Sequence, residues 1–400
     1  MNEIALGLVN TVDYEMEWDS AHLEKWISRT NLRRGDIEEK RKIYSIKDML
    51  SSILFHMGEG TGCGLLTESA EVIEEFMEGA KCRVTLGGTN LRAAEVISAL
   101  GGSAFVHLVS VNRDTIGQMP KGVEWVGGEK YPCCYPHLAI QFPKNASVRA
   151  NDIEIFAGRA NRVIYSGDIA CAQMPLDKEF FERAKKAAVL LLSGFDLIRN
   201  ADILQARLRE VRKLTEDFGE GGPLIFYEHA HFGDREFEDA VRLEMSSLSD
   251  IYSMNEEEFQ TLAGKKINLL KAEEVCAALK SACGKLSGVT LIVHTGYWAL
   301  AVGERAKEAE SALENGMVAA TARYGGWSVD QSAIQAVREL PCIAEAETFS
   351  EELKEDWGDG IVCLPVADIK NDTCVTVGLG DAFVGGFLYK YCADRMEREK

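Results

Sequence analysis

The stretch VLLLSGFDLIRNADILQARLREVRKLTEDFGEGGPLIFYE, residues 189–228, decides the fold class. It opens with the continuous apolar run Val189–Leu192 and closes with a second short apolar run at 224–227. Between them, residues 203–216 carry apolar side chains at helical spacing, and a glycine-rich stretch ends that pattern. An apolar strand, an amphipathic helix and another apolar strand in this order predict a parallel sheet covered on both faces.

The same alternation continues towards the C-terminus. Further strand-like runs lie at 251–253 and at 289–293, the second rich in β-branched residues. Amphipathic helical patterns cover 176–188, 236–245 and 272–286. We therefore expect an α/β fold with a mainly parallel central sheet and helices on both of its faces.

One region breaks this pattern and predicts a smaller sheet. Residues 130–166 contain short alternating runs interrupted by proline, asparagine and glycine, which is typical of antiparallel strands. We expect a small β-rich lid made of two discontinuous segments, about 9–35 and 125–165. The large α/β domain then takes mainly 36–124 and 166–400, and the whole chain makes one unit. A lid of this kind suits a reaction from which water must be excluded.

The composition argues against several classes of function. Asp+Glu 63 against Lys+Arg 44 gives a net charge of −19, so nucleic acid is not an expected partner. No apolar run approaches the roughly 20 residues that span a bilayer, and the first residues lack the basic segment of a secretion signal. The eleven cysteines have no C-x-x-C spacing, which favours reduced thiols. We expect a cytoplasmic protein that binds no membrane and is a monomer or homodimer.

The strongest functional signal is Gly378-Leu379-Gly380-Asp381, directly before a helix-like segment. Two glycines around one residue let backbone N–H groups turn towards an anion at a helix N-terminus, where the helix dipole favours negative charge. In one interpretation Asp381 only caps this helix. In the other, its carboxylate lies beside the bound anion and takes a proton from an attacking hydroxyl.

Polar side chains follow two of the expected strands. Glu228 ends its strand-like run, and Asn255 and Glu258 follow the next run about one helical turn apart. Open α/β sheets bind ligands at the carboxyl ends of their strands, and oxygen ligands suit Mg²⁺. The alternative is that acidic residues in a first helical turn complement the helix dipole. His229 and His231 are interpreted as polar loop residues, because no further zinc ligands match them.

Two glycine-rich turns and one strand end complete the candidate segments. In the turn 87–90 the glycines allow close approach to a ligand, and Thr89 and Asn90 can hydrogen-bond sugar hydroxyls, although a simple N-cap is the alternative for Asn90. The glycine-dense stretch 58–64 lacks Gly-Lys-Ser/Thr and is no P-loop. Val293-His294-Thr295 closes another strand-like run and taken alone is a polar strand end.

Seven segments together resemble the ADP-dependent sugar kinases, the glucokinase and phosphofructokinase family of the ribokinase-like superfamily. They are Gly7-Leu8-Val9-Asn10-Thr11-Val12-Asp13, Leu86-Gly87-Gly88-Thr89, Arg159-Ala160-Asn161-Arg162-Val163-Ile164, Phe226-Tyr227-Glu228, Asn255-Glu256-Glu257-Glu258, Val293-His294-Thr295 and Thr376-Val377-Gly378-Leu379-Gly380-Asp381. The resemblance runs nearly end to end, in the family's order. It implies a ribokinase-like three-layer sandwich with a small lid, ADP as phosphoryl donor, AMP as product and Mg²⁺ as cofactor.

The resemblance also assigns expected roles. The catalytic set is the base Asp381, the amides of Gly378, Leu379 and Gly380, and the lid residue Arg162. The residues expected to contact the sugar or sugar phosphate are Asn10, Asp13, Gly87, Gly88, Thr89 and Asn90. Glu59 joins them because a carboxylate suits the hydroxyls of an uncharged sugar. The expected nucleotide contacts are Asn255, His294, Thr295 and Val377, and the expected Mg²⁺ ligands are Glu228 and Glu258.

The sequence departs from the family pattern in two places. Phe226 replaces the histidine of the metal motif, and Thr89 replaces the glutamine of the substrate turn, so glucose recognition is not implied. Four cations favour a phosphorylated acceptor, namely Arg92, Arg149, Arg159 and Arg162. Glu59 favours an uncharged one.

Two other functions stay open on the sequence alone. An ATP-dependent carbohydrate or nucleoside kinase of the wider superfamily would share the segments 378–381 and 255–258, since the preference for ADP follows from the resemblance only. A non-catalytic nucleotide or sugar sensor would be expected to lose Asp381 or its glycines, and these are present. For Arg162, the alternative to a catalytic role is an ordinary salt bridge.

Overall fold

The larger part of the molecule is built on a nine-stranded sheet in the order β17-β16-β15-β14-β13-β12-β1-β6-β7. The computed structural model describes residues 3–130, 136–219, 221–286, 288–326, 328–369, 375 and 377–398. The strands of this sheet are β1 (Ile4–Leu6), β6 (Ala104–Leu108), β7 (Val123–Gly127), β12 (Val189–Leu192), β13 (Leu224–Glu228), β14 (Ile251–Asn255), β15 (Thr290–His294), β16 (Trp298–Val302) and β17 (Ile361–Pro365). Neighbours run parallel except for the pairs β15–β16 and β16–β17, so the expected mainly parallel sheet is confirmed.

Strand β12 shows why these runs are continuously apolar. Leu190 and Leu192 enter the hydrophobic core on one face of the sheet, whereas Val189 and Leu191 enter the core on the other face. All four side chains are fully buried. Because helices cover both faces, no position of the strand is left for a polar residue.

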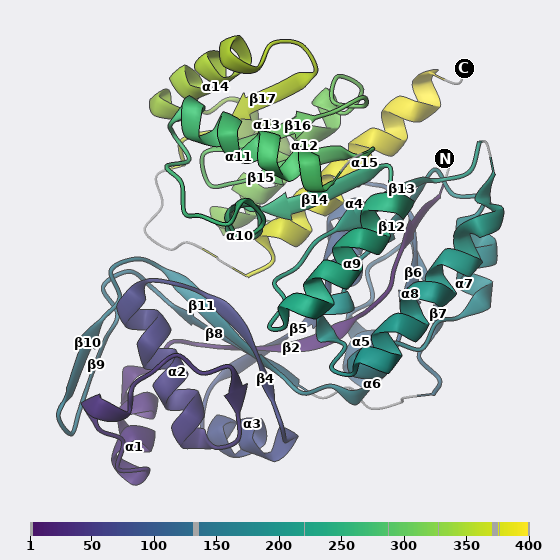
Figure 1. Ribbon diagram of the computed structural model, residues 1–400. Helices are drawn as coiled ribbons and strands as arrows, with labels where there is room; N and C mark the ends of the chain where they lie inside the picture. The colour runs from purple at the N-terminus through teal and green to yellow at the C-terminus, as the bar shows by residue number, and fades with distance from the viewer. Residues whose placement is uncertain are drawn as a thin grey trace.

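The two helical layers complete the three-layer arrangement (Figure 1). One face carries α4 (Thr89–Ala99), α12 (Glu310–Tyr324) and α15 (Leu379–Arg398), with α13 (Gln331–Arg338) packed on α12 and α4. The other face carries α6 (Ile169–Gln173), α7 (Lys178–Ala184), α8 (Ala201–Thr215), α9 (Arg235–Leu248), α10 (Glu256–Ala263), α11 (Ala272–Lys285) and α14 (Ala344–Trp357). The connections hold α5 (Arg113–Gln118), η2 (Phe195–Leu197) and η3 (Glu216–Phe218).

The smaller part is a six-stranded sheet in the order β3-β4-β11-β8-β2-β5 (Figure 1, lower left). Its strands are β2 (Thr11–Met16), β3 (Lys42–Ile43), β4 (Cys63–Thr67), β5 (Cys82–Gly87), β8 (Pro136–Phe142) and β11 (Asn161–Ser166). One face packs against α1 (Ser20–Arg29), α2 (Ile46–Glu59) and α3 (Ala70–Met77), near η1 (Arg34–Asp36) and the hairpin β9 (Ser147–Ala150)–β10 (Ile153–Phe156). The antiparallel pair β8–β11 agrees with the expectation for 130–166.

The extent of this smaller domain differs from the expected lid. Its sheet draws strands from residues 11–87 and 136–166, so 42–87 belong to it and not to the large domain. The reason is non-local pairing: β4 pairs with β11 and β5 pairs with β2, contacts that the local pattern of 36–87 does not contain. The chain therefore crosses between the domains four times. In the part of the chain that the structure describes, no helix is long and apolar enough to cross a membrane.

Candidate active site

A cleft of about 1500 Å³ separates the two sheets and collects most of the predicted site residues. The predicted residues that line it are Asp13, Gly88, Thr89, Arg162, Glu228, Asn255, Glu258, His294, Thr295, Val377, Gly378, Leu379, Gly380 and Asp381. They come from strands of both sheets and from the first turns of α4, α10 and α15. Residues more than 350 positions apart in the sequence thus face one cavity.

Four predicted acceptor residues do not line this cleft. Asn10 is fully buried and holds the chain after β6, because its side chain donates to the carbonyl of Ser110 and accepts from the amide of Val109. Asn90 is also buried and donates to the carbonyl of His107. Glu59 is exposed at the end of α2.

Gly87, the fourth of these residues, has a packing role. A Cβ atom there would lie 2.1 Å from Asp13 Oδ1 and 2.1 Å from Thr11 Oγ1, so any side chain would displace the Asp13 carboxylate. Gly87 therefore acts on the site through Asp13.

The glycine turn places the N-terminus of α15 in the cleft. Gly378 has φ +76°, which favours glycine, and its carbonyl accepts the first helical hydrogen bond from Ala382. The amides that follow it, up to Asp381, stand in the first turn, where a helix leaves N–H groups without intrahelical partners. Thr376, which begins the motif, lies outside the described residues. This end of α15 can receive an anion.

Asp381 stands in the first turn of α15 with its side chain 22% exposed. Burial raises the pKa of Asp381 above the ordinary value of an aspartate, while Arg92 and a hydrogen bond with Thr89 offset part of this rise. The charges of Asp13 and Glu228 act in the same direction as burial. A carboxylate with a raised pKa is a better proton acceptor, which suits a general base.

Arg92 contacts more of the site than its sequence context suggested. Its Nη2 donates to Asp13 Oδ2 over 2.8 Å and to Glu15 Oε1 over 3.2 Å, and its Nε lies 3.8 Å from Asp381 Oδ2. The sequence offered it only as a cation for a sugar phosphate. The signal for its actual partners was the acidic pair Asp13 and Glu15 at strand spacing, which places both carboxylates on one face of β2.

Glu228 and Glu258 form a buried pair of carboxylates at the carboxyl ends of β13 and β14. Glu228 Oε1 lies 3.1 Å from His294 Nε2, whereas its Oε2 is buried without a hydrogen-bond partner among the described residues. Ser253 lies opposite Glu228 on β14, and its hydroxyl is also buried without a hydrogen-bond partner among the described residues. Burial and the nearby charge of Glu228 raise the pKa of Glu258 well above its usual range. This donor set fits a divalent cation bound by oxygen ligands.

Asn255 and Glu258 also satisfy the N-terminus of α10. The Asn255 side chain accepts from the amides of Glu257 and Glu258, and Glu258 Oε2 accepts from the amide of Asn255 over 2.9 Å. This reciprocal arrangement is a capping box. The capping box uses Glu258 Oε2 and leaves Oε1 as the oxygen that could serve a ligand.

The strand end at His294 and Thr295 has mixed roles. His294 stacks on Phe383 of α15 with ring centroids 4.5 Å apart, which ties β15 to the glycine turn. The hydroxyl of Thr295 accepts from the amides of Tyr297 and Trp298 and so shapes the β15–β16 turn. Both residues line the cleft, so a nucleotide would meet the turn that Thr295 stabilises.

The four predicted cations separate into two groups. Arg159 and Arg162 line the cleft from the small domain, and neither is within ion-pair distance of a carboxylate in the described part of the chain. Arg149 lies on the exposed β9–β10 hairpin, paired with Glu154 over 2.8 Å. With Arg92 held by carboxylates, Arg159 and Arg162 are the two of these four that remain for an anionic ligand.

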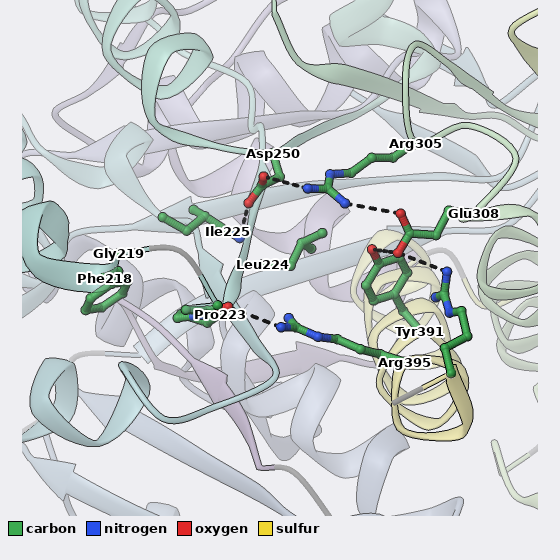
Figure 2. A pocket seen from close by; sticks show the side chains of 13 residues that line it. Phe218, Gly219, Pro223, Leu224, Ile225, Asp250, Arg305, Glu308, Tyr391 and Arg395 are labelled. Atoms are coloured by element: carbon green, nitrogen blue, oxygen red, sulfur yellow. Dashed lines mark hydrogen bonds and ion pairs between the residues drawn. The ribbon is translucent and has the colours of Figure 1, made fainter. Parts of the chain in front are cut away.

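A second cavity of about 590 Å³ lies at the opposite, amino-terminal edge of the large sheet (Figure 2). Its charged groups satisfy one another: Asp250 accepts from the amide of Ile225 and pairs with Arg305, and Glu308 accepts from the hydroxyl of Tyr391 (Figure 2). Arg395 donates to backbone carbonyls. These pairs hold the sheet edge to α15, and none of the predicted site residues lies there.

A further group of donor atoms lies where β8 meets the segment leading to α6. His137, Asp168 and Cys171 are all buried, with one ligand atom of each within 4.8 Å of the others. The Oδ1 of Asp168 accepts from the amides of Ala170 and Cys171 and so caps α6. The group thus belongs to the junction between the two domains.

Solved structures show the same fold along nearly the whole chain. A hypothetical ADP-dependent phosphofructokinase from Pyrococcus horikoshii OT3 shares 18% identity over 99% of both chains, with a TM-score of 0.77. An ADP-dependent kinase in complex with fructose-6-phosphate and ADPβS shares 15% identity over 98% of this chain and 93% of that one, with a TM-score of 0.76. Adenosine kinase from Sinorhizobium meliloti shares 14% identity over 98% and 88%, with a TM-score of 0.51. The ribokinase-like architecture is confirmed.

The sequence itself defines the family. The model of the family described as "ADP-specific Phosphofructokinase/Glucokinase conserved region" matches residues 2–389 of the chain. Among curated proteins, none matches the chain by sequence. The chain belongs to the ADP-specific phosphofructokinase/glucokinase family and is therefore a phosphotransferase that acts on a sugar hydroxyl with ADP as the family's donor.

Proposed function

We propose that the protein transfers the terminal phosphoryl group of ADP to a hydroxyl of a sugar or sugar phosphate, with Asp381 as the base. One observation carries this proposal. A half-buried carboxylate with a raised pKa, Asp381, stands beside the N-terminus of α15 in a cleft that also holds the buried pair Glu228 and Glu258.

Asp381 would accept the proton of the acceptor hydroxyl. The acceptor oxygen then forms a bond to the terminal phosphorus of ADP, and the bond from that phosphorus to the bridging oxygen breaks. The bridging oxygen keeps the electron pair and leaves with AMP. Placement of the base at the anion site keeps the proton transfer short, as in other phosphoryl transfers.

The first turn of α15 would hold the charge on the transferred phosphoryl oxygens. The amides of Gly378, Leu379 and Gly380 at the start of α15 would donate to an anion there, and the helix dipole would add favourable potential. Gly378 supports this role because its positive φ turns the backbone at the start of the helix. Donors fixed before the reaction need no reorganisation during it.

Glu228 and Glu258 would hold Mg²⁺. The unpartnered buried oxygen of Glu228 and the remaining oxygen of Glu258 are hard anionic donors of the type that Mg²⁺ prefers. Bound Mg²⁺ would neutralise part of the negative charge on the ADP phosphates. His294 keeps Glu228 in place through their 3.1 Å contact.

The acceptor would lie between Asp13 and Thr89 on one side and the small-domain arginines on the other. Arg162 would meet the transferred phosphoryl group when the two domains close, and therefore stabilise the transition state more than the bound substrates. Arg159 is the remaining cation for a phosphate on the acceptor, which favours a sugar phosphate over a free sugar. The solved kinase complex with fructose-6-phosphate supports this acceptor class. The nucleotide would contact Asn255, His294, Thr295 and Val377.

The substitution Asp381→Asn tests the assignment of the base. It keeps the size of the side chain, so ADP binding measured by calorimetry should stay within about threefold, while turnover falls by roughly 10²–10⁴-fold. Turnover close to that of the unchanged protein would remove Asp381 as the base. For the unchanged protein, turnover with ATP and none with ADP would favour the wider group of ribokinase-like kinases, and tight ADP binding without any turnover would favour a sensor.

A further inference from the structure

Arg92 lies at the junction of the two domains, one helical turn after Thr89 in α4. Its side chain is 7% exposed. Three of its contacts are to strands of the small sheet, because Nη2 donates to Asp13 and Glu15 of β2 and, over 3.3 Å, to Thr85 of β5. The guanidinium also approaches Gly378 and Asp381 at the start of α15 in the large domain.

Two observations show how closely Arg92 approaches the start of α15. Nε lies 3.8 Å from Asp381 Oδ2. A Cβ atom on Gly378 would lie 2.8 Å from Arg92 Nη1, so the guanidinium packs directly against the glycine turn. The planar, branched cation reaches two domains at once, which a lysine ammonium could not do with the same geometry.

Arg92 lies among several charged side chains. Four carboxylates interact electrostatically with its guanidinium: Asp13 and Glu15 on β2, Glu95 on α4 and Asp381 on α15. The other nearby charges are Arg83 on β5, Arg323 on α12 and, next to Asp381, Glu228 on β13. Among the described residues Arg83, which is 63% exposed, pairs with Glu15 only, and Arg323 donates to the carbonyl of Val377.

Resting on the proposed function, we propose that Arg92 is a positioning residue that holds the acceptor-binding carboxylate Asp13 and the base Asp381 in one charge network across the two domains. Asp13 is fixed on both oxygens, since Thr11 donates to Oδ1 over 2.7 Å and Arg92 to Oδ2 over 2.8 Å. The same guanidinium lowers the pKa of Asp381 against the effect of burial and so favours its ionised form. An acceptor hydroxyl bound by Asp13 is thereby set at a fixed distance from the group that deprotonates it.

The test compares Arg92→Met, Arg92→Lys and the control Arg83→Met. Arg83 shares the partner Glu15 but contacts neither Asp13 nor Asp381 in the described structure. Removing the cation next to Asp381 should raise the pH of the acidic limb of kcat by about one unit or more. The lost alignment should lower kcat roughly 10²-fold, with ADP affinity unchanged. Arg92→Lys should restore part of both effects, and Arg83→Met should leave the profile as it is.

The outcomes separate a positioning role from a structural one. Lower thermal stability of Arg92→Met with an unshifted acidic limb would overturn the inference, as would an equal shift in Arg83→Met. An infrared pH titration of the protonated carboxyl band that Asp381→Asn abolishes gives a readout without turnover. A shift of this band in Arg92→Met, found together with no AMP formation by the unchanged protein, would support the charge network and count against the proposed function. An unshifted band would count against the network itself.

Discussion

Asp381 is both a helix-start residue and a half-buried acid, and the second property has a measurable consequence. Burial raises its pKa, and the base must be ionised to accept a proton. The kcat should therefore fall as the pH drops through a value above the ordinary range of an aspartate, and it should be constant at higher pH. A kcat profile at saturating Mg²⁺, ADP and acceptor measures this limb. A limb at the ordinary aspartate value would contradict the assigned environment.

Gly378 is a second position where a single atom decides the geometry. Gly378→Ala places a side chain at φ +76° and against Arg92, so the turn must shift. The backbone amides of the turn would then no longer point towards the anion site. We expect kcat to fall at least about tenfold.

Gly79→Ala is the matched control for this effect. Gly79 has φ +80° with nothing within 4 Å of its added Cβ, so the substitution should cost about 1 kcal/mol of stability and leave kcat unchanged. Denaturant unfolding and steady-state kinetics on both variants separate backbone strain from damage to the site. Equal kinetic losses in the two variants would refute the role of the turn.

Residue motifs were predictable where the chemistry is local. The turn at Gly378 and the proposed base Asp381 lie three positions apart in the sequence, so the pattern contains both. The partners of Arg92 were not predictable, because Asp13 and Asp381 lie 79 and 289 positions away and meet it only through packing of the two domains. Glu59 shows the converse, since its glycine-rich context suggested a ligand loop but its side chain is exposed.

Helix α10 links local capping to the proposed metal site. Its N-cap Asn255 fixes the turn that carries Glu258, so Asn255→Ala should cost about 1 kcal/mol of stability and also raise the Mg²⁺ concentration needed for half-maximal activity. Asn200→Ala is the control, because Asn200 caps α8 with the same pair of amide contacts away from the cleft.

Melting curves and Mg²⁺ titrations of activity measure the two effects. Both variants should lose similar stability, and only Asn255→Ala should change the Mg²⁺ requirement. A change of equal size in Asn200→Ala would show that the effect comes from general destabilisation.

At the level of elements, strands β12 to β15 of the large sheet were predictable, whereas in the small sheet only the antiparallel strands within 130–166 were. Strand β12 is buried on both faces, so its run is apolar throughout. The helical patterns before and after it lie close by in the sequence, so a local pattern identifies the strand. Strand β4 is short, contains one glycine, Gly64, and pairs with β11 about 100 positions later. No local period records such a pairing, which is why residues 42–87 were assigned to the wrong domain.

At the scale of the whole molecule, the proposed reaction requires the small domain to bring Arg162 to the phosphoryl group. Arg162→Gln should lower kcat about 10²-fold or more, with ADP binding nearly unchanged, because the contact forms only in the closed transition state. Arg149→Gln is the control, since Arg149 belongs to the same domain but points to the exposed Glu154. Kinetics and calorimetry on both variants test this. If Arg162→Gln lost ADP affinity by the same factor as kcat, Arg162 would contact the bound ADP as well as the transition state, which would contradict this role.

The most direct test of the central claim is the nucleotide product formed by the unchanged protein. With Mg²⁺ and ADP, and in parallel with ATP, a panel of free sugars and sugar phosphates is assayed for AMP and ADP. We predict AMP release that depends on the acceptor, in equal amount to the phosphorylated product, and strongest with a sugar phosphate. Acceptor phosphorylation with ATP alone, or tight ADP binding with no AMP from any acceptor, would contradict it.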